Sequence, residues 1–553
     1  MTNREPSTHD EQNSIGDAVF ISAPVPRRET AHLNRALSWS IDDLLRPDAF
    51  PHEVNELQLR ETHISWVILT GQFAYKIKKP VKLDFIDAST LERRRHHCEE
   101  EIRLNRRFAP DLYVGMVAIT LKNGRAVVGT DGPAVDYAVR MRQFSASEEL
   151  PALLARNDVD AAQVTALGQR LAEFHLDAKV APTMRAPEKT EQICSSLFGN
   201  LSQLLQSANL IEQRARLERL VAWTRNTARE LEPSFLFRES EGFVREGHGD
   251  LHAANIVRHD GHLVPFDCIE FDPSLRWIDV IDDVAFLVMD LMSHERADLV
   301  TALLSRYLEV TGDYAGMRLL PFYAAYRALV RAKVDALSVR SVPARAAEFR
   351  ERLERRLRAA ESWTTHRQPT LILMHGASGS GKSWLSSRLV PEIPAIRIRS
   401  DLERKRLAHL NSTQSAAAGV RQGIYSQRFS HRTYERLAEC AEECLRAGFN
   451  VIVDASFLEA DDRERFHALA RELGAAHLIV SCEADAITLS ERITERSSSG
   501  EDPSDATLAV LDAQLREFKP ISASEDLSVI AVDTQMPNVV QRVVQEIRTR
   551  CSK

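Results

Sequence analysis

Cysteine and uninterrupted apolar sequence are both scarce in this chain. Seven cysteines are scattered over 553 residues, without a Cys-x-x-Cys pair. That number and spacing argue against the disulfide framework of small secreted proteins. No window approaches the roughly eighteen apolar residues of a transmembrane helix, and the polar N-terminus lacks the basic-then-apolar layout of a signal peptide. We therefore expect a cytoplasmic protein without membrane association.

The chain also lacks a large excess of charge. Its formal net charge is −8, and hydrophobic and charged residues make up 44% and 27% of it. This composition is typical of a soluble globular protein, and the length predicts two or three domains. Proteins that bind nucleic acid through its phosphates usually carry a basic surface. Nucleic acid is therefore an unlikely partner, although a local basic groove would be compatible with this charge.

The first part of the chain has the pattern of a mixed domain. Residues 1–35 are polar and aperiodic, which predicts a disordered tail. Two strand-like runs around a Thr70-Gly71 turn predict a hairpin, a charged helix follows at 91–109, and further strand-like runs continue the sheet. Helical periods dominate beyond about residue 151. We predict an α+β domain over residues 36–350.

The last third has a different pattern. Residues 351–368 begin as a highly charged helix, which we interpret as a helical linker with a solvated face. Five short apolar strands then alternate with helices to the end of the chain. This alternation predicts a parallel sheet with helices on both faces, an α/β domain over residues 369–553.

A glycine-rich loop follows the first of these strands. Residues 376–383 read GASGSGKS and match G-x-x-x-x-G-K-[ST], and a helix follows them. The alternative is a Gly/Ser-rich turn that matches the motif by chance, but such a turn would not be expected between a strand and a helix. Glycines let backbone N–H groups surround phosphate oxygens, Lys382 is predicted to reach the β and γ phosphates, and Ser383 to bind Mg²⁺. The predicted ATP-binding residues are Gly376, Ala377, Ser378, Gly379, Ser380, Gly381, Lys382 and Ser383.

Two polar residues follow the second strand of this domain. Asp401 comes directly after the strand, at the edge of the sheet where ligands of parallel sheets bind. Its carboxylate is predicted to orient and deprotonate an acceptor hydroxyl, and Arg404, one helical turn later, to hold the acceptor or a phosphate. The alternative is a helix-capping aspartate followed by a solvated arginine.

Three more residues are candidates in the same domain. Asp454 ends the third strand and is predicted to hold Mg²⁺ through water or to bind the acceptor; the alternative is a strand-end cap. Arg492 and Arg496 lie four residues apart, on one face of a helix that precedes a Ser/Gly-rich loop. They are predicted to belong to a lid over the nucleotide. A solvated arginine pair is the alternative.

GASGSGKS, followed by RSDLERKR, VIVDASF and the arginine-bearing lid, resembles the small P-loop kinases. These include the polynucleotide kinase, zeta-toxin and gluconate/chloramphenicol kinase relatives. The resemblance covers residues 369–553 and implies an ATP-dependent phosphotransferase in which Lys382, Asp401 and Arg404 are catalytic. Acceptors in that group range from sugars to nucleic-acid ends, so the resemblance leaves the acceptor open.

A second motif lies in the first domain. Residues 248–255 read HGDLHAAN, and Asp267 follows a predicted hairpin. This order of an acid, an asparagine and a second acid is that of eukaryotic-like kinases. Asp250 is predicted to accept the proton of an attacking hydroxyl, and Asn255 and Asp267 to hold Mg²⁺. The motif resembles the aminoglycoside and choline phosphotransferase branch, which implies an α+β eukaryotic-like kinase domain.

Such a domain needs a strand lysine paired with a helix glutamate. Lys76, with Lys78 as alternate, and Glu100, with Glu101 beside it, are the candidates for that nucleotide-binding pair. No G-x-G-x-x-G loop precedes Lys76, and only a Thr-Gly-Gln turn is present. A domain that binds or senses the nucleotide without catalysis is therefore an alternative.

The order of the two domains resembles the bacterial bifunctional aminoglycoside phosphotransferase/ATP-binding proteins, over nearly everything after the first fifty residues. We predict a phosphotransferase with two sites for ATP and Mg²⁺ and a small-molecule hydroxyl acceptor. The alternatives are a nucleotide-dependent regulatory ATPase and a nucleic-acid end kinase. Asp401 and Arg404 favour an acceptor kinase over a switch, which needs no acceptor base.

Overall fold

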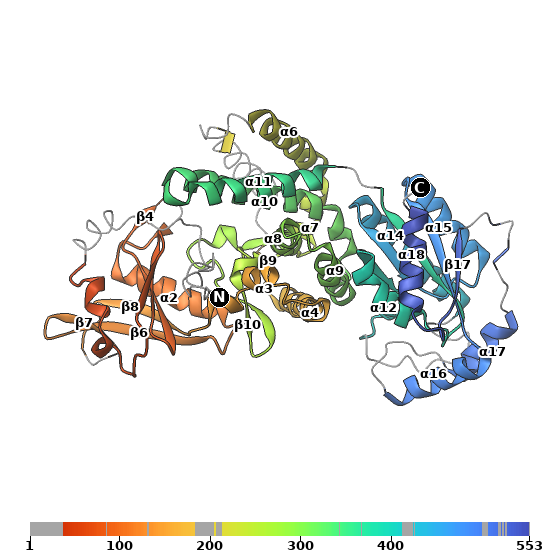
Figure 1. Cartoon of the computed structure of the whole chain (residues 1–553), viewed down its shortest axis with the longest axis horizontal. Coiled ribbons are helices and arrows are strands. Elements are labelled where there is room, and N and C mark those ends of the chain that lie inside the picture. Colours follow the sequence, from red (N-terminus) through yellow and green to blue (C-terminus); the bar gives the residue numbers. More distant parts are fainter. Residues whose placement is uncertain are drawn as a thin grey trace, which may run out of the picture. The chain divides into compact units, whose positions relative to one another are not determined.

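The computed structural model forms two compact units (Figure 1). The first unit comprises Met1–Val159, Asp177–His294 and Phe322–Ser362, and the second comprises Asp160–Leu176, Glu295–Pro321 and Trp363–Lys553. The tail predicted at residues 1–35 lies outside the described residues. The structure describes residues 37–83, 86–129, 132–182, 204–205, 213–341, 343–365, 368–411, 424, 426–499, 507–517, 521–522, 525 and 528–551.

An antiparallel sheet of six strands forms one part of the first unit, in the order β1-β2-β3-β8-β6-β7 (Figure 1, red to orange). The predicted hairpin is confirmed, since Leu69 pairs with Ala74 across the turn. Trp66, Ile68 and Tyr75 are fully buried beneath the sheet. The strands are β1 (Gln58–Glu61), β2 (Ser65–Leu69), β3 (Phe73–Lys78), β6 (Tyr113–Lys122), β7 (Arg125–Val128) and β8 (Asp136–Arg142).

The charged helix predicted after the hairpin is α2 (Leu91–Asn105), and it packs against β8 and β6. The hydroxyl of Thr90 accepts a hydrogen bond from the N–H of Arg93 and caps the helix N-terminus. The inner face of α2 carries charged as well as apolar side chains. Arg94 donates to Asp136 of β8 over 2.9 Å, and Glu101 is fully buried. The helix therefore brings ionised groups under the sheet.

The rest of the first unit is mostly helical. Helix α8 (Val280–Ser293) is buried from Val280 to Leu291 and carries three aspartates among apolar residues. The other elements include β9 (Val244–Glu246), β10 (Ile256–His259), β11 (His262–Pro265), β12 (Trp277–Asp279), α3 (Leu150–Ala155), α6 (Arg214–Glu230), α7 (Glu232–Ser240), α10 (Leu320–Ser341) and α11 (Ala346–Thr364).

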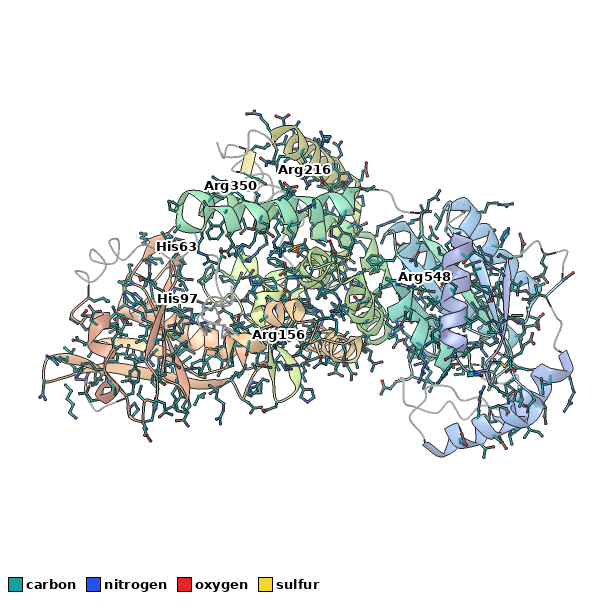
Figure 2. The ribbon with its side chains drawn as sticks, in the orientation of Figure 1. His63, His97, Arg156, Arg216, Arg350 and Arg548 are labelled. Carbon is teal, nitrogen blue, oxygen red and sulfur yellow. The ribbon has the colours of Figure 1, made fainter. Side chains whose placement is uncertain are left out.

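The charged helix that was expected to link two domains has partners of its own. It is α11, and the first compact unit includes it as far as Ser362. Arg216 of α6, labelled in Figure 2, forms ion pairs with Glu354, over 2.6 Å, and with Glu361. Arg356 of α11 pairs with the buried Asp290 of α8. These pairs match charges across helices, which a run of charges in the sequence does not reveal.

The second unit contains the predicted parallel sheet (Figure 1, teal to blue). Its order is β14-β15-β13-β16-β17, and all five predicted strands are confirmed. Helices α12 and α18 pack on one face, and α14 and α15 also contact the sheet. The elements are β13 (Thr370–His375), α12 (Lys382–Glu392), β14 (Ala395–Arg399), α13 (Ser400–Leu407), α14 (Gln427–Arg446), β15 (Asn450–Asp454), α15 (Ala460–Glu472), β16 (Ala476–Glu483), α16 (Ala486–Ser499), α17 (Leu508–Glu517), β17 (Val529–Asp533) and α18 (Val539–Cys551).

The second unit also includes helices from the sequence predicted to belong to the first domain. These are α4 (Ala161–Asp177), α9 (Ala297–Thr311) and the short helix η7 (Tyr314–Arg318). Helix α9 contacts β14 and α12, and η7 contacts α14. The compact units therefore differ here from the predicted domains at 36–350 and 369–553. Helix α9 is buried on several sides, so its apolar pattern does not identify its partners.

None of the described helices is both long and apolar enough to cross a membrane.

We expect Gly168→Ala to destabilise the second unit, because α4 and α9 approach each other closely at this position. A Cβ at Gly168 would lie 2.6 Å from the carbonyl oxygen of Leu303. Alanine favours helices over glycine by about 1 kcal/mol, but overpacking costs about 1–3 kcal/mol, so a net loss of up to about 2 kcal/mol is expected. The difference between the urea unfolding midpoints of the variant and the wild type measures this loss of stability. A variant more stable than the wild type would contradict the close packing.

Candidate nucleotide-binding sites

The glycine-rich loop connects β13 to α12 in the second unit. Gly376, Gly379 and Gly381 have φ angles of 137°, 84° and 86°, which side chains rarely adopt. A Cβ at Gly376 would lie 2.4 Å from the carbonyl oxygen of Cys482, and one at Gly379 2.6 Å from that of Leu489. Glycine is therefore required both by the backbone conformation and by the neighbouring chain.

The lysine and serine that end the motif have defined partners. The Nζ of Lys382 donates to the carbonyl oxygens of Gly376, at 2.8 Å, and Ala377, at 2.7 Å. The Ser383 hydroxyl donates to Asp454 over 3.2 Å, and the Ser386 hydroxyl to the other oxygen of Asp454 over 3.0 Å. Serine and aspartate oxygens side by side are the hard donors that Mg²⁺ prefers.

Strand pairing explains why Ser383 and Asp454 meet. Strand β15 lies beside β13, and Asp454 at its end is in register with Met374, just before the loop. Parallel strands end at the same edge of a sheet, where the loop and α12 also begin. Ser386 was not identified from the sequence. The only available signal was its position one helical turn after Ser383.

A cleft of about 790 Å³ connects the loop with the predicted acceptor residues. Asp401 lies in the first turn of α13 and lines the cleft together with Arg404, Asp454 and Lys382. The guanidinium of Arg404 donates to the carbonyl oxygen of Ile424 over 2.9 Å and to the Ser430 hydroxyl over 3.2 Å. The structure therefore brings Asp401 and Arg404 to one cavity with the loop.

Arg492 of α16 also lines this cleft. It donates to the carbonyl oxygen of Gly379 over 3.3 Å and to the Thr534 hydroxyl over 2.9 Å. Arg496 belongs to the same helix, and its side chain lies outside the described part of the chain. Arg492 thus contacts the phosphate-binding loop itself, where its charge can act on a bound phosphate.

Several lining residues were missed by sequence reasoning. They belong to α14 and to the first turn of α15, which carry no recognisable motif and reach the cleft through packing of the helices. Burial raises the pKa of Asp462 to about 6, although Arg465 and His431 oppose this shift. The missed residues include Gln427, Ser430, His431, Tyr434, Asp461 and Asp462.

The HGDLHAAN segment of the first unit is braced by helix α8. The backbone N–H groups of His248 and Gly249 donate to the carboxylate of Asp283, at 2.7 and 3.0 Å. The His248 ring nitrogen Nε2 lies 2.9 Å from the carbonyl oxygen of Phe266 and donates to it. Burial lowers the pKa of His248, which keeps the ring neutral. These contacts fix the loop that carries Asp250.

Asp250 and Asn255 lie together as the motif predicts. The Asn255 amide donates to the backbone carbonyl of Asp250 over 2.9 Å and to its carboxylate over 3.2 Å. The Nε2 atom of His252 lies 3.3 Å from the same carboxylate. Burial acts to raise the pKa of Asp250, but attraction by His252 and Arg331 outweighs it and holds that pKa below its usual value. Asp250 is therefore an ionised acceptor at neutral pH.

A buried network of charges joins the sheet, α2 and Asp267. The Nζ of Lys76 lies 2.5 Å from Asp267 and 2.8 Å from Glu101, and the Nζ of Lys78 lies 2.5 Å from Glu101 and also contacts Glu270. Asp267 has a φ of 65°, an uncommon conformation for a residue with a side chain. Burial raises the pKa of Asp267 to about 6 against the attraction of Lys76.

The structure corrects the predicted partner of Lys76 from Glu100 to Glu101. Glu100 pairs instead with Arg103, at 2.8 Å, and with Arg276, at 3.2 Å. Successive residues of a helix point about 100° apart, so only one of the two glutamates faces the sheet. Burial opposes ionisation of Glu101, but Lys76 and Lys78 outweigh it and lower its pKa to about 2.

The parallel sheet, the glycine-rich loop and the helix that follows define the second unit as a P-loop nucleotide-binding domain. A model of the AAA domain family matches residues 371–521. The uncharacterized proteins Rv2004c of Mycobacterium tuberculosis and Mb2027c of Mycobacterium bovis are each 30% identical over 463 residues, which cover 84% of this chain and 91% of each relative. The chain belongs to the family of these mycobacterial proteins.

Solved structures also resemble parts of the chain. A sugar kinase from Janibacter sp. HTCC2649 is 18% identical with a TM-score of 0.26, over 33% of this chain and 95% of its own. The amicoumacin kinase hAmiN, in complex with AMP-PNP, Ca²⁺ and Ami, is 14% identical with a TM-score of 0.37, over 61% of this chain and 97% of its own.

We expect Glu101→Gln to destabilise the first unit by roughly 1–3 kcal/mol, because two buried lysines lose their shared carboxylate and keep only Asp267 and Glu270. Glu100→Gln is the matched control and should cost about 1 kcal/mol or less, since Arg103 and Arg276 both keep Glu246 as a partner. Urea unfolding at pH 7 compares the two. The pKa of Glu101 lies near 2, so its contribution is present at pH 7 and is lost as the pH falls toward that value. Equal effects of the two changes would contradict the assignment.

Proposed function

We propose that the protein is an ATP-dependent phosphotransferase whose second unit transfers the γ-phosphoryl group of MgATP to a hydroxyl of a small-molecule acceptor. One observation carries the proposal. A single cleft contains the phosphate-binding loop, the Ser383–Asp454 pair and the α13 residues Asp401 and Arg404. A regulatory ATPase would need the first two, but it has no use for a carboxylate that faces an acceptor.

In this proposal the loop amides and the α12 N-terminus bind the phosphates, and Lys382 exchanges its contacts with the loop carbonyls for phosphate oxygens. Ser383 and Asp454 would hold Mg²⁺, which neutralises charge on the β and γ phosphates when bound. Asp401 orients the acceptor hydroxyl and takes its proton, while Arg404 is held toward the cleft by Ile424 and Ser430.

The first unit is proposed as a second site for MgATP. Lys76, paired with Glu101, would bind the phosphates, and Asn255 and Asp267 would hold Mg²⁺ beside the proton acceptor Asp250. The contact between Lys76 and Asp267 supports this role. Nucleotide binding without transfer remains the alternative for this unit, since no G-x-G-x-x-G loop precedes Lys76.

The acidic residues after the HGDLHAAN motif support an acceptor other than a polycation. A site for several amines needs carboxylates that are free to bind them. Each of the five acids at residues 270–283 already has a partner within the fold, either a side chain or a backbone N–H. The pairs are Glu270 with Lys78, Asp272 with the N–H of Ser274, Asp279 with Arg238, Asp282 with Arg327, and Asp283 with the N–H of His248.

Lys382→Ala should remove most phosphoryl transfer by the second unit, because the lysine neutralises charge on the phosphates that separate. The full chain carries Asp250→Asn in this assay, so that the first unit is silent. Labelled ATP with a fractionated metabolite pool measures transfer to an acceptor, and release of phosphate to water is measured in parallel. More than about a tenth of the parent activity in the variant would contradict the role of Lys382. Release to water alone, by the parent protein, would favour the regulatory ATPase.

We also expect that the first unit does not phosphorylate aminoglycosides. A strain that expresses the full chain should keep its tolerance to kanamycin and streptomycin, and purified protein with Lys382→Ala should transfer no label to either drug. A large rise in tolerance that Asp250→Asn abolishes would contradict this expectation.

A further inference from the structure

Helix α9 lies along the edge strand of the parallel sheet in the second unit. Strand β14 is the outermost strand on its side of the sheet. The Ser305 hydroxyl of α9 accepts a hydrogen bond from the N–H of Arg397 over 3.1 Å and lies 3.4 Å from the carbonyl oxygen of Ala395. Glu309 pairs with the Arg397 guanidinium over 2.9 Å. The helix therefore bonds backbone and side chain of the strand that leads into α13.

The C-terminal end of α9 is also bound to the elements that form the acceptor side of the cleft. The guanidinium of Arg406, on α13, donates to the carbonyl oxygen of Glu309 over 2.7 Å. The guanidinium of Arg436, on α14, donates to the carbonyl oxygen of Gly312 over 3.1 Å. Carbonyl groups at a helix C-terminus have no partner within the helix and attract positive charge.

Both arginines converge on one buried carboxylate of α13. Glu403 is fully buried, pairs with Arg406, and lies 3.3 Å from Arg436. A buried carboxylate without matched cations would be strongly unfavourable, so this arrangement fixes the rotation of α13 about its axis. Glu403 stands between Asp401 and Arg404 in the sequence, and both of these line the cleft. Because all three residues lie on α13, the orientation of the Glu403 side chain also sets the orientation of the Asp401 and Arg404 side chains.

We infer that residues 297–318, which comprise α9 and η7, position the acceptor groups Asp401 and Arg404 through Glu403, Arg406 and Arg436. This inference rests on the proposed function of the second unit. Glu403 and the two arginines are positioning residues, since the contacts described for them are with protein groups. The P-loop site is accordingly incomplete without a segment that precedes its first strand in the chain and that the sequence pattern groups with the kinase-like domain.

Gly312→Ala tests the inference, with Gly474→Ala as its matched control. Gly312 has a φ of 71°, and a Cβ there would lie 2.5 Å from Nε of Arg406. Gly474 has a φ of 64° in the same unit, and a Cβ there would meet no atom within 4 Å. Both changes strain the backbone to a similar degree, but only the first displaces Arg406.

Transfer is measured on the full chain with Asp250→Asn, with glycerol, D-glucose and D-gluconate as probe acceptors beside the metabolite pool. We expect Gly312→Ala to lower kcat/KM for the acceptor about tenfold to a hundredfold, as misplacement of reacting groups does. The KM for ATP should change less than about twofold, and Gly474→Ala should leave both parameters within that range. Equal effects of the two glycine changes, or a loss confined to ATP, would overturn the inference.

Amide hydrogen exchange gives an independent readout. Exchange of the α13 amides should be faster in Gly312→Ala than in Gly474→Ala, and equal exchange in the two would overturn the inference. If the parent protein transfers phosphate to no acceptor, the proposed function fails, and exchange still decides this inference.

A variant that keeps Gly312 covers the case in which Gly312→Ala does not fold. Arg406→Lys retains the charge but shortens the reach to Glu309 and Glu403, so it should lower kcat/KM for the acceptor in the same selective way. Arg446→Lys, in an exposed pair with Glu442 of the same helix, is its control. Equal effects of these two changes would also overturn the inference.

Discussion

An ionised carboxylate in the protein interior has lost its hydration and must be matched by nearby cations. Glu101 in the first unit and Glu403 in the second are fully buried. The cations that neutralise them also make the next contact: Lys76 reaches Asp267, and Arg406 reaches a backbone carbonyl of α9. Charge matching in the interior thus helps to determine where Asp267 and the acceptor groups of α13 lie. The arrangement recurs in two unrelated folds because the constraint is electrostatic.

The phosphate-binding loop depends on a second constraint, the close approach of backbones. Gly376 and Gly379 lie against the carbonyl oxygens of Cys482 and Leu489, which belong to β16 and α16. The conformation of the loop therefore depends on the strand and helix beside it as well as on its own sequence. Because Arg492 of α16 donates to the same loop, a displacement of α16 would alter the shape of the phosphate site.

The two compact units are interleaved in the sequence. Helix α8, whose aspartates brace the HGDLHAAN segment, ends at Ser293, and α9 begins at Ala297 in the other unit. A fragment that starts at the first strand of the P-loop domain would lack α4 and α9, and with α9 the contacts of Ser305 and Glu309 to β14. The full chain is therefore the appropriate material for study of either site.

The sequence by itself determined the features that adjacent residues define. The phosphate-binding loop, the five strands of the parallel sheet and the first hairpin are local patterns of glycine, apolar period and turn residues. The order of Asp250, Asn255 and Asp267 was also readable, because one loop and one hairpin connect them.

Only the tertiary structure decided which of two adjacent glutamates meets Lys76, because a shift of one residue turns a helical side chain by about 100°. Ser386 and the α14 residues of the cleft were also identified only from the tertiary structure, because packing between elements brings them to the site. The assignment of α9 to the P-loop unit depends on contacts such as Glu309 with Arg397, between residues that are far apart in the sequence. Such contacts form only when the chain folds, since local patterns fix the shape of a segment but not the partner that buries it.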